Sequence, residues 1–98
     1  MIWSRPALGD LVRLHAFLAE SHPPAAAKLV QAITVAVGRL AQRPRLGVRL
    51  EGFEPHEVRR IIVGRYELRY ALADGQLQVL RLWHTREERD GAGHIWPY

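Results

Sequence analysis

The segment that decides the fold of this chain is Tyr66-Glu67-Leu68-Arg69-Tyr70-Ala71-Leu72. Large apolar side chains stand at every second position, and charged or small side chains stand between them. Because successive side chains of a β-strand point to opposite faces of a sheet, this alternation predicts a strand rather than a helix. We expect one face of this strand to pack against helices, and the residues on that face are Tyr66, Leu68, Tyr70 and Leu72.

Three further strands are predicted around this segment. A turn at Gly64–Arg65 precedes it, and the β-branched run 58–63 lies before that turn. Asp74–Gly75 follows it and is a strong hairpin signal, so the apolar run 77–83 is predicted to be the next strand. A short apolar piece at 48–50, after Gly47, completes four strands in the second half of the chain.

The first half of the chain predicts two helices. Ser4 offers an N-cap and Pro6 is tolerated in a first turn, so the first helix begins there and ends near Ser21. Its apolar stripe is formed by Ala7, Leu11, Leu14 and Leu18. We place Asp10 on the solvated side of this helix, together with Arg13 and Glu20.

A second apolar stripe begins after Pro23–Pro24 and ends at Pro44; its residues are Ala26, Leu29, Ile33, Val37 and Leu40. Two amphipathic helices joined by so short a loop form an antiparallel hairpin, and they need a sheet to bury their stripes. Met1–Trp3 is predicted to be a first strand. The expected fold is therefore α+β, with an N-terminal strand and an antiparallel helical hairpin packed on one face of a mostly antiparallel β-sheet.

Composition narrows the class of protein. The chain has 98 residues, 48% hydrophobic and 24% charged, and it contains no cysteine. This excludes a disulfide framework, a thiol nucleophile and a cysteine-based zinc site. The five histidines lack acidic residues at ligand spacing, so we expect neither a metal nor a cofactor. No segment resembles a membrane span or a signal peptide, and a soluble, cytoplasmic protein without a membrane partner is expected.

The basic charge of the chain points to acidic partners. Its formal net charge is +4, and Lys28 is the only lysine among fourteen basic residues. Arginine binds phosphate and carboxylate in a bidentate manner and stacks on aromatic rings. A GC-rich genome would also favour arginine, and both explanations stay open. A basic domain favours nucleic acid, a ribonucleoprotein or an acidic protein segment as its partner, although neither helix has the basic face that groove binding needs.

The segments 58–70 and 80–87 resemble the RelE/ParE superfamily, the toxins of bacterial type II toxin–antitoxin systems. The first is similar to the family's strand, glycine turn and tyrosine-flanked strand, and the second to its closing strand, which runs into a His-x-Arg segment. Ile2-Trp3-Ser4 and Asp10-Leu11 also fit the family's opening. The resemblance implies a single toxin domain over residues 1–89, a C-terminal tail at 90–98, and a growth inhibitor neutralised by a cognate antitoxin.

The family contains two mechanisms on one fold. ParE-like members inhibit DNA gyrase, whereas RelE-like members cut messenger RNA in the ribosomal A site. For a nuclease, the resemblance offers Arg60 as a basic strand residue and Arg86 to stabilise the phosphorane, and the imidazole of His84 could replace a proton-transfer group. However, Glu67 stands where those nucleases have an arginine, and no tyrosine stands around Ala92. We therefore favour the non-catalytic gyrase inhibitor and keep the ribosome-dependent endoribonuclease as the alternative.

Contacts with the target or the antitoxin are expected from a second set of residues, namely Arg59, Arg69, Arg81, Trp83 and Arg89. Structural roles are also open for them. Arg59 points to the opposite face of its strand from Arg60, Arg69 shares a face with Glu67 and can pair with it, and Arg81 can pack on Trp83.

Some apolar surface should stay exposed on the isolated toxin. The candidates are the strand Met1–Trp3 and the tail aromatics Trp96 and Tyr98. Antitoxin segments lie in toxin grooves as a helix or as an added strand.

Overall fold

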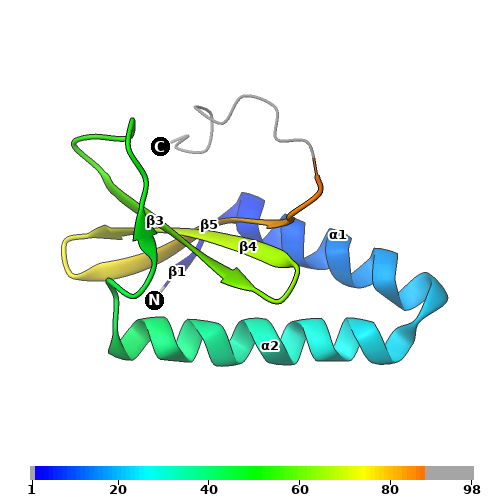
Figure 1. The fold of residues 1–98 in the computed structure, drawn as a ribbon. Coiled ribbons are helices and arrows are strands. Elements are labelled where there is room, and N and C mark those ends of the chain that lie inside the picture. Colours follow the sequence, from blue (N-terminus) through cyan, green and yellow to red (C-terminus); the bar gives the residue numbers. More distant parts are fainter. Residues whose placement is uncertain (1, 88–98) are drawn as a thin grey trace.

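The computed structural model describes residues 2–87, which form one sheet and two helices (Figure 1). The elements follow in the order β1 (Ile2–Trp3), α1 (Arg5–Ser21), α2 (Pro23–Gln42), β2 (Val48–Arg49), β3 (Glu57–Val63), β4 (Tyr66–Ala73) and β5 (Gln76–His84). The strand order across the sheet is β1-β5-β4-β3-β2, with β1 parallel to β5 and every other pair antiparallel. The helices run antiparallel on one face of the sheet (Figure 1), which confirms the predicted α+β fold.

Local sequence signals account for the ends of the helices. The hydroxyl oxygen of Ser4 accepts a hydrogen bond from the backbone N–H of Ala7 at 3.1 Å, which is the predicted N-cap. The same hydroxyl donates to the carbonyl oxygen of Leu80 at 2.9 Å, so the cap also ties α1 to β5. The second helix begins at Pro23, where the missing N–H of proline costs no hydrogen bond.

The main core lies between the helices and the sheet. The predicted stripe of α2 is buried along its whole length, and Leu68 and Tyr70 of β4 are fully buried against the helices. Tyr66 and Leu72 are partly buried and pack against the same core, which confirms the predicted inward face of β4. Trp3 also packs there, whereas Ile2 is 48% exposed, so the expected apolar surface at the N-terminal strand is present only in part.

The opposite face of the sheet carries a second, smaller core, which the sequence analysis did not anticipate. Its buried members are Val58, Ala71, Leu80 and Trp83. Leu50 and Phe53, from the loop between β2 and β3, pack against them. Both faces of β4 are therefore buried, and the charged side chains between its apolar residues are buried as well: Glu67 is 1% exposed and Arg69 is 8% exposed.

Candidate functional site

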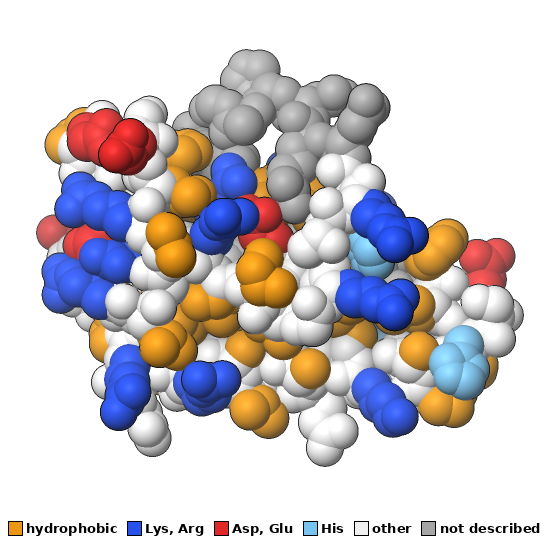
Figure 2. All heavy atoms as spheres, viewed as in Figure 1, with side chains coloured by type: hydrophobic (Ala, Val, Ile, Leu, Met, Phe, Trp, Pro, Cys, Tyr) orange, Lys and Arg blue, Asp and Glu red, His pale blue; other side chains and the backbone are white. Residues whose placement is uncertain are grey.

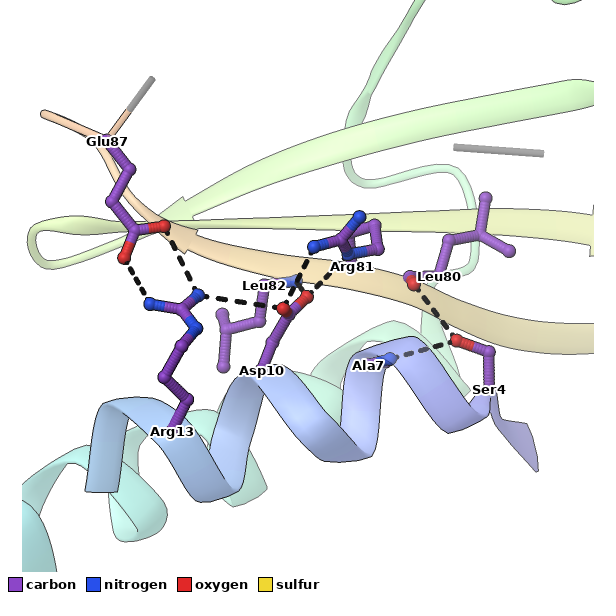
Figure 3. Close-up of polar contacts among 8 residues, drawn as sticks. All are labelled: Ser4, Ala7, Asp10, Arg13, Leu80, Arg81, Leu82 and Glu87. Atoms are coloured by element: carbon purple, nitrogen blue, oxygen red, sulfur yellow. Dashed lines mark hydrogen bonds and ion pairs between the residues drawn. The ribbon is translucent and has the colours of Figure 1, made fainter. Parts of the chain in front are cut away.

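An acidic side chain of α1 holds the helix to β5 (Figure 3). The carboxylate of Asp10 accepts hydrogen bonds from Nε and Nη2 of Arg81, at 2.7 and 3.0 Å, and from the backbone N–H of Leu82 at 2.9 Å. Asp10 is 5% exposed, so its predicted place on the solvated side of the helix is wrong. The hydrogen bond to Asp10 raises the pKa of Arg81 and so keeps its guanidinium protonated.

A β-bulge interrupts the pairing of β4 with β5 next to these contacts. Arg69 pairs with Arg81, but the next residue of β4, Tyr70, pairs with Val79, so the register shifts at this point. Strict alternation would put Val79, Arg81 and Trp83 on one face; instead Val79 lies in the helix-side core and Trp83 in the opposite core. The outer edge of β5 beyond β1 is then closed by the side chains of Ser4 and Asp10, as Figure 3 shows.

The far face of the sheet brings three of the predicted arginines together around one carboxylate and one indole. Arg69 donates to Glu67 at 2.9 Å, which confirms their predicted pairing, and Nη1 of Arg60 lies 3.6 Å from the same carboxylate. The guanidinium carbons of Arg69 and Arg81 lie 4.8 and 5.1 Å from the ring centroid of Trp83. These cation–π contacts match the predicted packing of Arg81 on the indole. Arg69 and Trp83 are buried, so they offer little surface to a partner.

Arg59 and Arg60 point to opposite faces of β3, as predicted. Nε of Arg59 donates to Glu57 at 2.8 Å, and its Nη1 donates to the carbonyl oxygen of Gly47 at 2.7 Å. Arg59 therefore fastens β3 to the segment that precedes β2, whereas Arg60 is 44% exposed at its side chain. Arg60 is thus the more accessible of the two.

The residues offered for nuclease chemistry lie on different sides of the sheet. The ring of His84 stands edge-on to that of Tyr66, on the helix side, with 5.3 Å between the ring centroids. Its Nδ1 accepts a hydrogen bond from the backbone N–H of Arg86 at 3.1 Å, so a neutral ring carries its proton on Nε2. Arg60 lies on the far side, and Arg86 is exposed in the turn after β5. Arg89, Ala92, the tail 90–98 and its aromatics lie outside the described residues, as does Met1.

A long groove runs between α2 and the edge strand β3. It encloses about 900 Å³ and is lined mainly by apolar side chains, with Lys28, Arg39 and Arg60 among its basic members. Val35, Val48 and Ile62 line it and are 60%, 64% and 53% exposed, which is high for side chains of this kind. Figure 2 shows hydrophobic side chains gathered over α2 and the sheet on this face, with Lys and Arg side chains around them.

The edge of β3 is open along this groove. β2 begins at Val48, opposite Arg60, and after it the N–H of Leu50 donates to the carbonyl oxygen of Val58. Peptide groups of alternate residues point to the same side of a strand, so those of Ile62 also point away from β4. Within residues 2–87 no strand lies beside them.

A second, smaller pocket lies between α1 and the turn that joins β3 to β4. It encloses about 480 Å³, and its lining residues are Arg13, Leu14, Phe17, Leu18, Arg65, Tyr66, His84 and Glu87. At its rim Arg13 forms a bidentate ion pair with Glu87, with N–O distances of 2.6 and 3.3 Å (Figure 3). The hydrogen bond to Glu87 raises the pKa of Arg13. The sequence did not predict this ion pair, because Glu87 is 74 residues away from Arg13. It did not single out the exposed Phe17 either.

Neither a membrane span nor a metal-binding cluster is found within residues 2–87. No helix in this part of the chain is long and apolar enough to cross a membrane. No group of three or more histidine, aspartate or glutamate side chains in it could hold a metal ion.

Comparison with known proteins finds relatives over most of the chain. A family model described as the ParE toxin of the type II toxin–antitoxin system parDE matches residues 1–89. Toxin RelE2 of Caulobacter vibrioides is 30% identical over 85 residues, which cover 87% of this chain and 93% of that protein. The solved structure of a chromosomal ParDE TA system from P. aeruginosa matches with a TM-score of 0.69 and 25% identity, over 84% of this chain and 90% of that chain.

Proposed function

This chain belongs to the ParE toxin family of type II toxin–antitoxin systems, and from that premise we propose that it stops growth by binding DNA gyrase and performs no chemistry of its own. A cognate antitoxin neutralises it by covering the groove between α2 and β3. The residues that carry the proposal are Arg60, His84, Arg86 and Glu67.

The single observation that favours binding over cleavage is the separation of the candidate catalytic groups. Cutting RNA requires a base, an acid and a charge stabiliser that reach the same phosphate. Arg60 lies on the far face of the sheet and His84 on the helix face, against Tyr66. One phosphate cannot meet both side chains across a packed sheet.

The charge around Arg60 supports the same conclusion. Glu67 is buried between β3 and β5, 2.9 Å from Arg69 and 3.6 Å from Arg60. A buried carboxylate neutralises nearby guanidinium groups and repels a phosphate that approaches them. The arginines of this face are therefore better suited to structure and to protein contacts than to transition-state stabilisation.

The alternative is a ribosome-dependent mRNA endoribonuclease, and the name of the relative Toxin RelE2 favours it. In that case His84 moves a proton and Arg86 stabilises the phosphorane. The two functions are separated by running two assays side by side on the purified chain: inhibition of supercoiling by DNA gyrase, and cleavage of mRNA on ribosomes.

We expect gyrase inhibition and no cleavage, and His84→Ala to retain most of the inhibition. A proton-transfer group contributes about 10²–10⁴-fold in rate, so in a nuclease His84→Ala would lose roughly that factor. Codon-dependent cleavage by the unmodified chain would refute the proposal. Normal growth of cells that express soluble, folded chain without its antitoxin would refute the toxin activity itself.

The groove has the features of an antitoxin site. It combines exposed apolar side chains, an unpaired strand edge at Ile62 and a basic rim, which together suit an acidic amphipathic segment that packs as a helix or adds as a strand. Ile62→Asp should weaken antitoxin binding at least tenfold and leave toxicity intact. Val12→Asp is the matched control, because Val12 is 68% exposed and lies outside the groove. Equal effects of the two substitutions on antitoxin affinity would place the antitoxin elsewhere.

A further inference from the structure

We propose that the pocket between α1 and the β3–β4 turn is the surface with which the toxin holds its protein target, and that it takes an apolar side chain from an acidic segment of that target. This inference rests on the proposed function and adds to it the place and the chemistry of target recognition.

The interior of the pocket is apolar and open to solvent. Leu14 and Leu18 of α1 and Tyr66 of β4 line it, and all three belong to the main core or pack against it. Phe17 forms a wall of the pocket and is 70% exposed. The volume of about 480 Å³ lies within the roughly 300–1,000 Å³ of ligand pockets. An apolar side chain that entered the pocket would remove this exposed surface from water.

The walls of the pocket are held in place before any partner arrives. His84 is fixed by its edge contact with Tyr66 and by the backbone N–H of Arg86 at Nδ1. The N–H of Thr85 donates to the carbonyl oxygen of Arg65 at 2.9 Å, which closes the end of the β4–β5 pair. A preformed pocket orders little on binding, so a partner loses less entropy there than on a flexible surface.

The apolar interior of the pocket favours a protein side chain over an RNA phosphate, and the charges at its rim suit an acidic segment. Arg65 lines the pocket and Arg86 follows His84 in the adjoining turn, and both are exposed. Arg13 is already paired with Glu87, so this pair adds little net charge to the rim. Acidic side chains on either side of an apolar one can pair with Arg65 and Arg86 while the apolar side chain fills the pocket.

The pocket shares no lining residue with the groove between α2 and β3. The groove is built from α2, β2 and β3, whereas the pocket is built from α1 and from residues at and beyond the ends of β4 and β5. Substitutions in the pocket therefore leave the proposed antitoxin surface unchanged. The two surfaces can be tested independently.

Phe17→Ala is the principal test, with Val12→Ala as its control. Both residues are exposed on α1, at 70% and 68%, and only Phe17 lines the pocket. We expect the concentration of toxin that half-inhibits gyrase supercoiling to rise at least tenfold for Phe17→Ala and to stay unchanged for Val12→Ala. Arg65→Glu should produce a similar loss. Antitoxin affinity should be the same for all three variants.

A second measurement does not depend on gyrase. The unmodified chain is titrated with a short capped peptide that has a central phenylalanine flanked by aspartates, and in parallel with a single-stranded RNA oligonucleotide, while the resonances of Tyr66 and His84 are followed by NMR. The peptide should shift both resonances, and Phe17→Ala should abolish the shifts.

Four results would overturn the inference. If Phe17→Ala inhibits gyrase at the same concentration as the unmodified chain, the pocket does not bind the target. Loss of antitoxin affinity in Phe17→Ala would assign the pocket to the antitoxin. Shifts caused by the RNA alone would assign it to nucleic acid, and no shift with either probe would leave it without a ligand. If the peptide shifts the resonances of Tyr66 and His84 but the chain does not inhibit gyrase, gyrase is refuted as the target. The preference of the pocket for an apolar side chain in an acidic segment is then still supported.

Discussion

Asp10→Ala should strongly destabilise the toxin, because Asp10 is a buried carboxylate that joins α1 to β5. The substitution removes the acceptor of three hydrogen bonds, two from Arg81 and one from the backbone N–H of Leu82. Because Asp10 is 5% exposed, water reaches the vacated position poorly. The backbone N–H at the β-bulge and the guanidinium of Arg81 then lose their partner together.

The size of the effect follows from these two groups. A buried N–H without an acceptor costs about 1–3 kcal/mol, and a hydrogen bond to a charged group contributes about 1.5–3 kcal/mol. The side chain of Arg81 is 31% exposed, so water compensates part of its loss. We expect the free energy of unfolding to fall by about 3 kcal/mol, which corresponds to a fall in Tm of roughly 12–24 °C for a domain of this size. Asp10→Asn keeps an oxygen for Leu82 and should cost about 1–2 kcal/mol.

Urea unfolding of Asp10→Ala, Arg81→Met and the double variant measures the interaction directly. Arg81→Met keeps an apolar stem over Trp83 and removes the charge that Asp10→Ala leaves behind. The double variant should therefore be less destabilised than the sum of the single variants, by about 1–3 kcal/mol. A cost below about 1 kcal/mol for Asp10→Ala, or strictly additive effects, would refute the role given to Asp10.

Three further outcomes are expected. Gly47→Ala should cost about 1–3 kcal/mol in denaturant unfolding, because its Cβ would lie 2.6 Å from the carbonyl oxygen of Arg60 and 2.7 Å from the hydroxyl of Tyr70. Burial raises the pKa of Tyr70, so the folded state holds that proton more tightly and stability should fall as the pH rises above the ordinary tyrosine value of 10.0. Tyr70→Phe should lack this alkaline loss when unfolding midpoints are compared across pH. The hydrogen bond from Arg45 lowers the pKa of Glu57, so the contribution of Glu57 to stability is present above the ordinary glutamate pKa and is lost as the pH falls. The free energy of unfolding of Glu57→Gln should therefore depend less steeply on pH in the acid range.

The elements of the fold were predictable because their signals are local. The cap at Ser4, the alternation of β4 and the hairpin at Asp74–Gly75 each occupy a few consecutive residues, and each lies where it was predicted. The pairing of Arg69 with Glu67 was also within reach, since residues two apart share a face of a strand.

The contacts that depend on tertiary packing were not predictable. Asp10 meets Arg81 across 71 residues of sequence, and it does so at a bulge that the regular alternation of β5 conceals. The groove exists because β2 begins only at Val48, so that within residues 2–87 no strand covers the outer edge of β3 beyond Arg60, and no local residue pattern predicts this. The opposite placement of Arg60 and His84 likewise required the register of the whole sheet.

The two margins of the sheet are not equivalent, and this limits how copies of the toxin can associate. One margin is the two-residue strand β1, beyond which Ser4 and Asp10 occupy the hydrogen-bonding groups of β5. The other margin, at Ile62, is open within the described residues. If two antitoxin-free copies paired through this margin, each would occupy the open edge of the other. No open edge would then be left on that side for a third copy, so the contact cannot extend into a fibre. Sedimentation at rising concentration should accordingly detect no edge-linked species heavier than a pair.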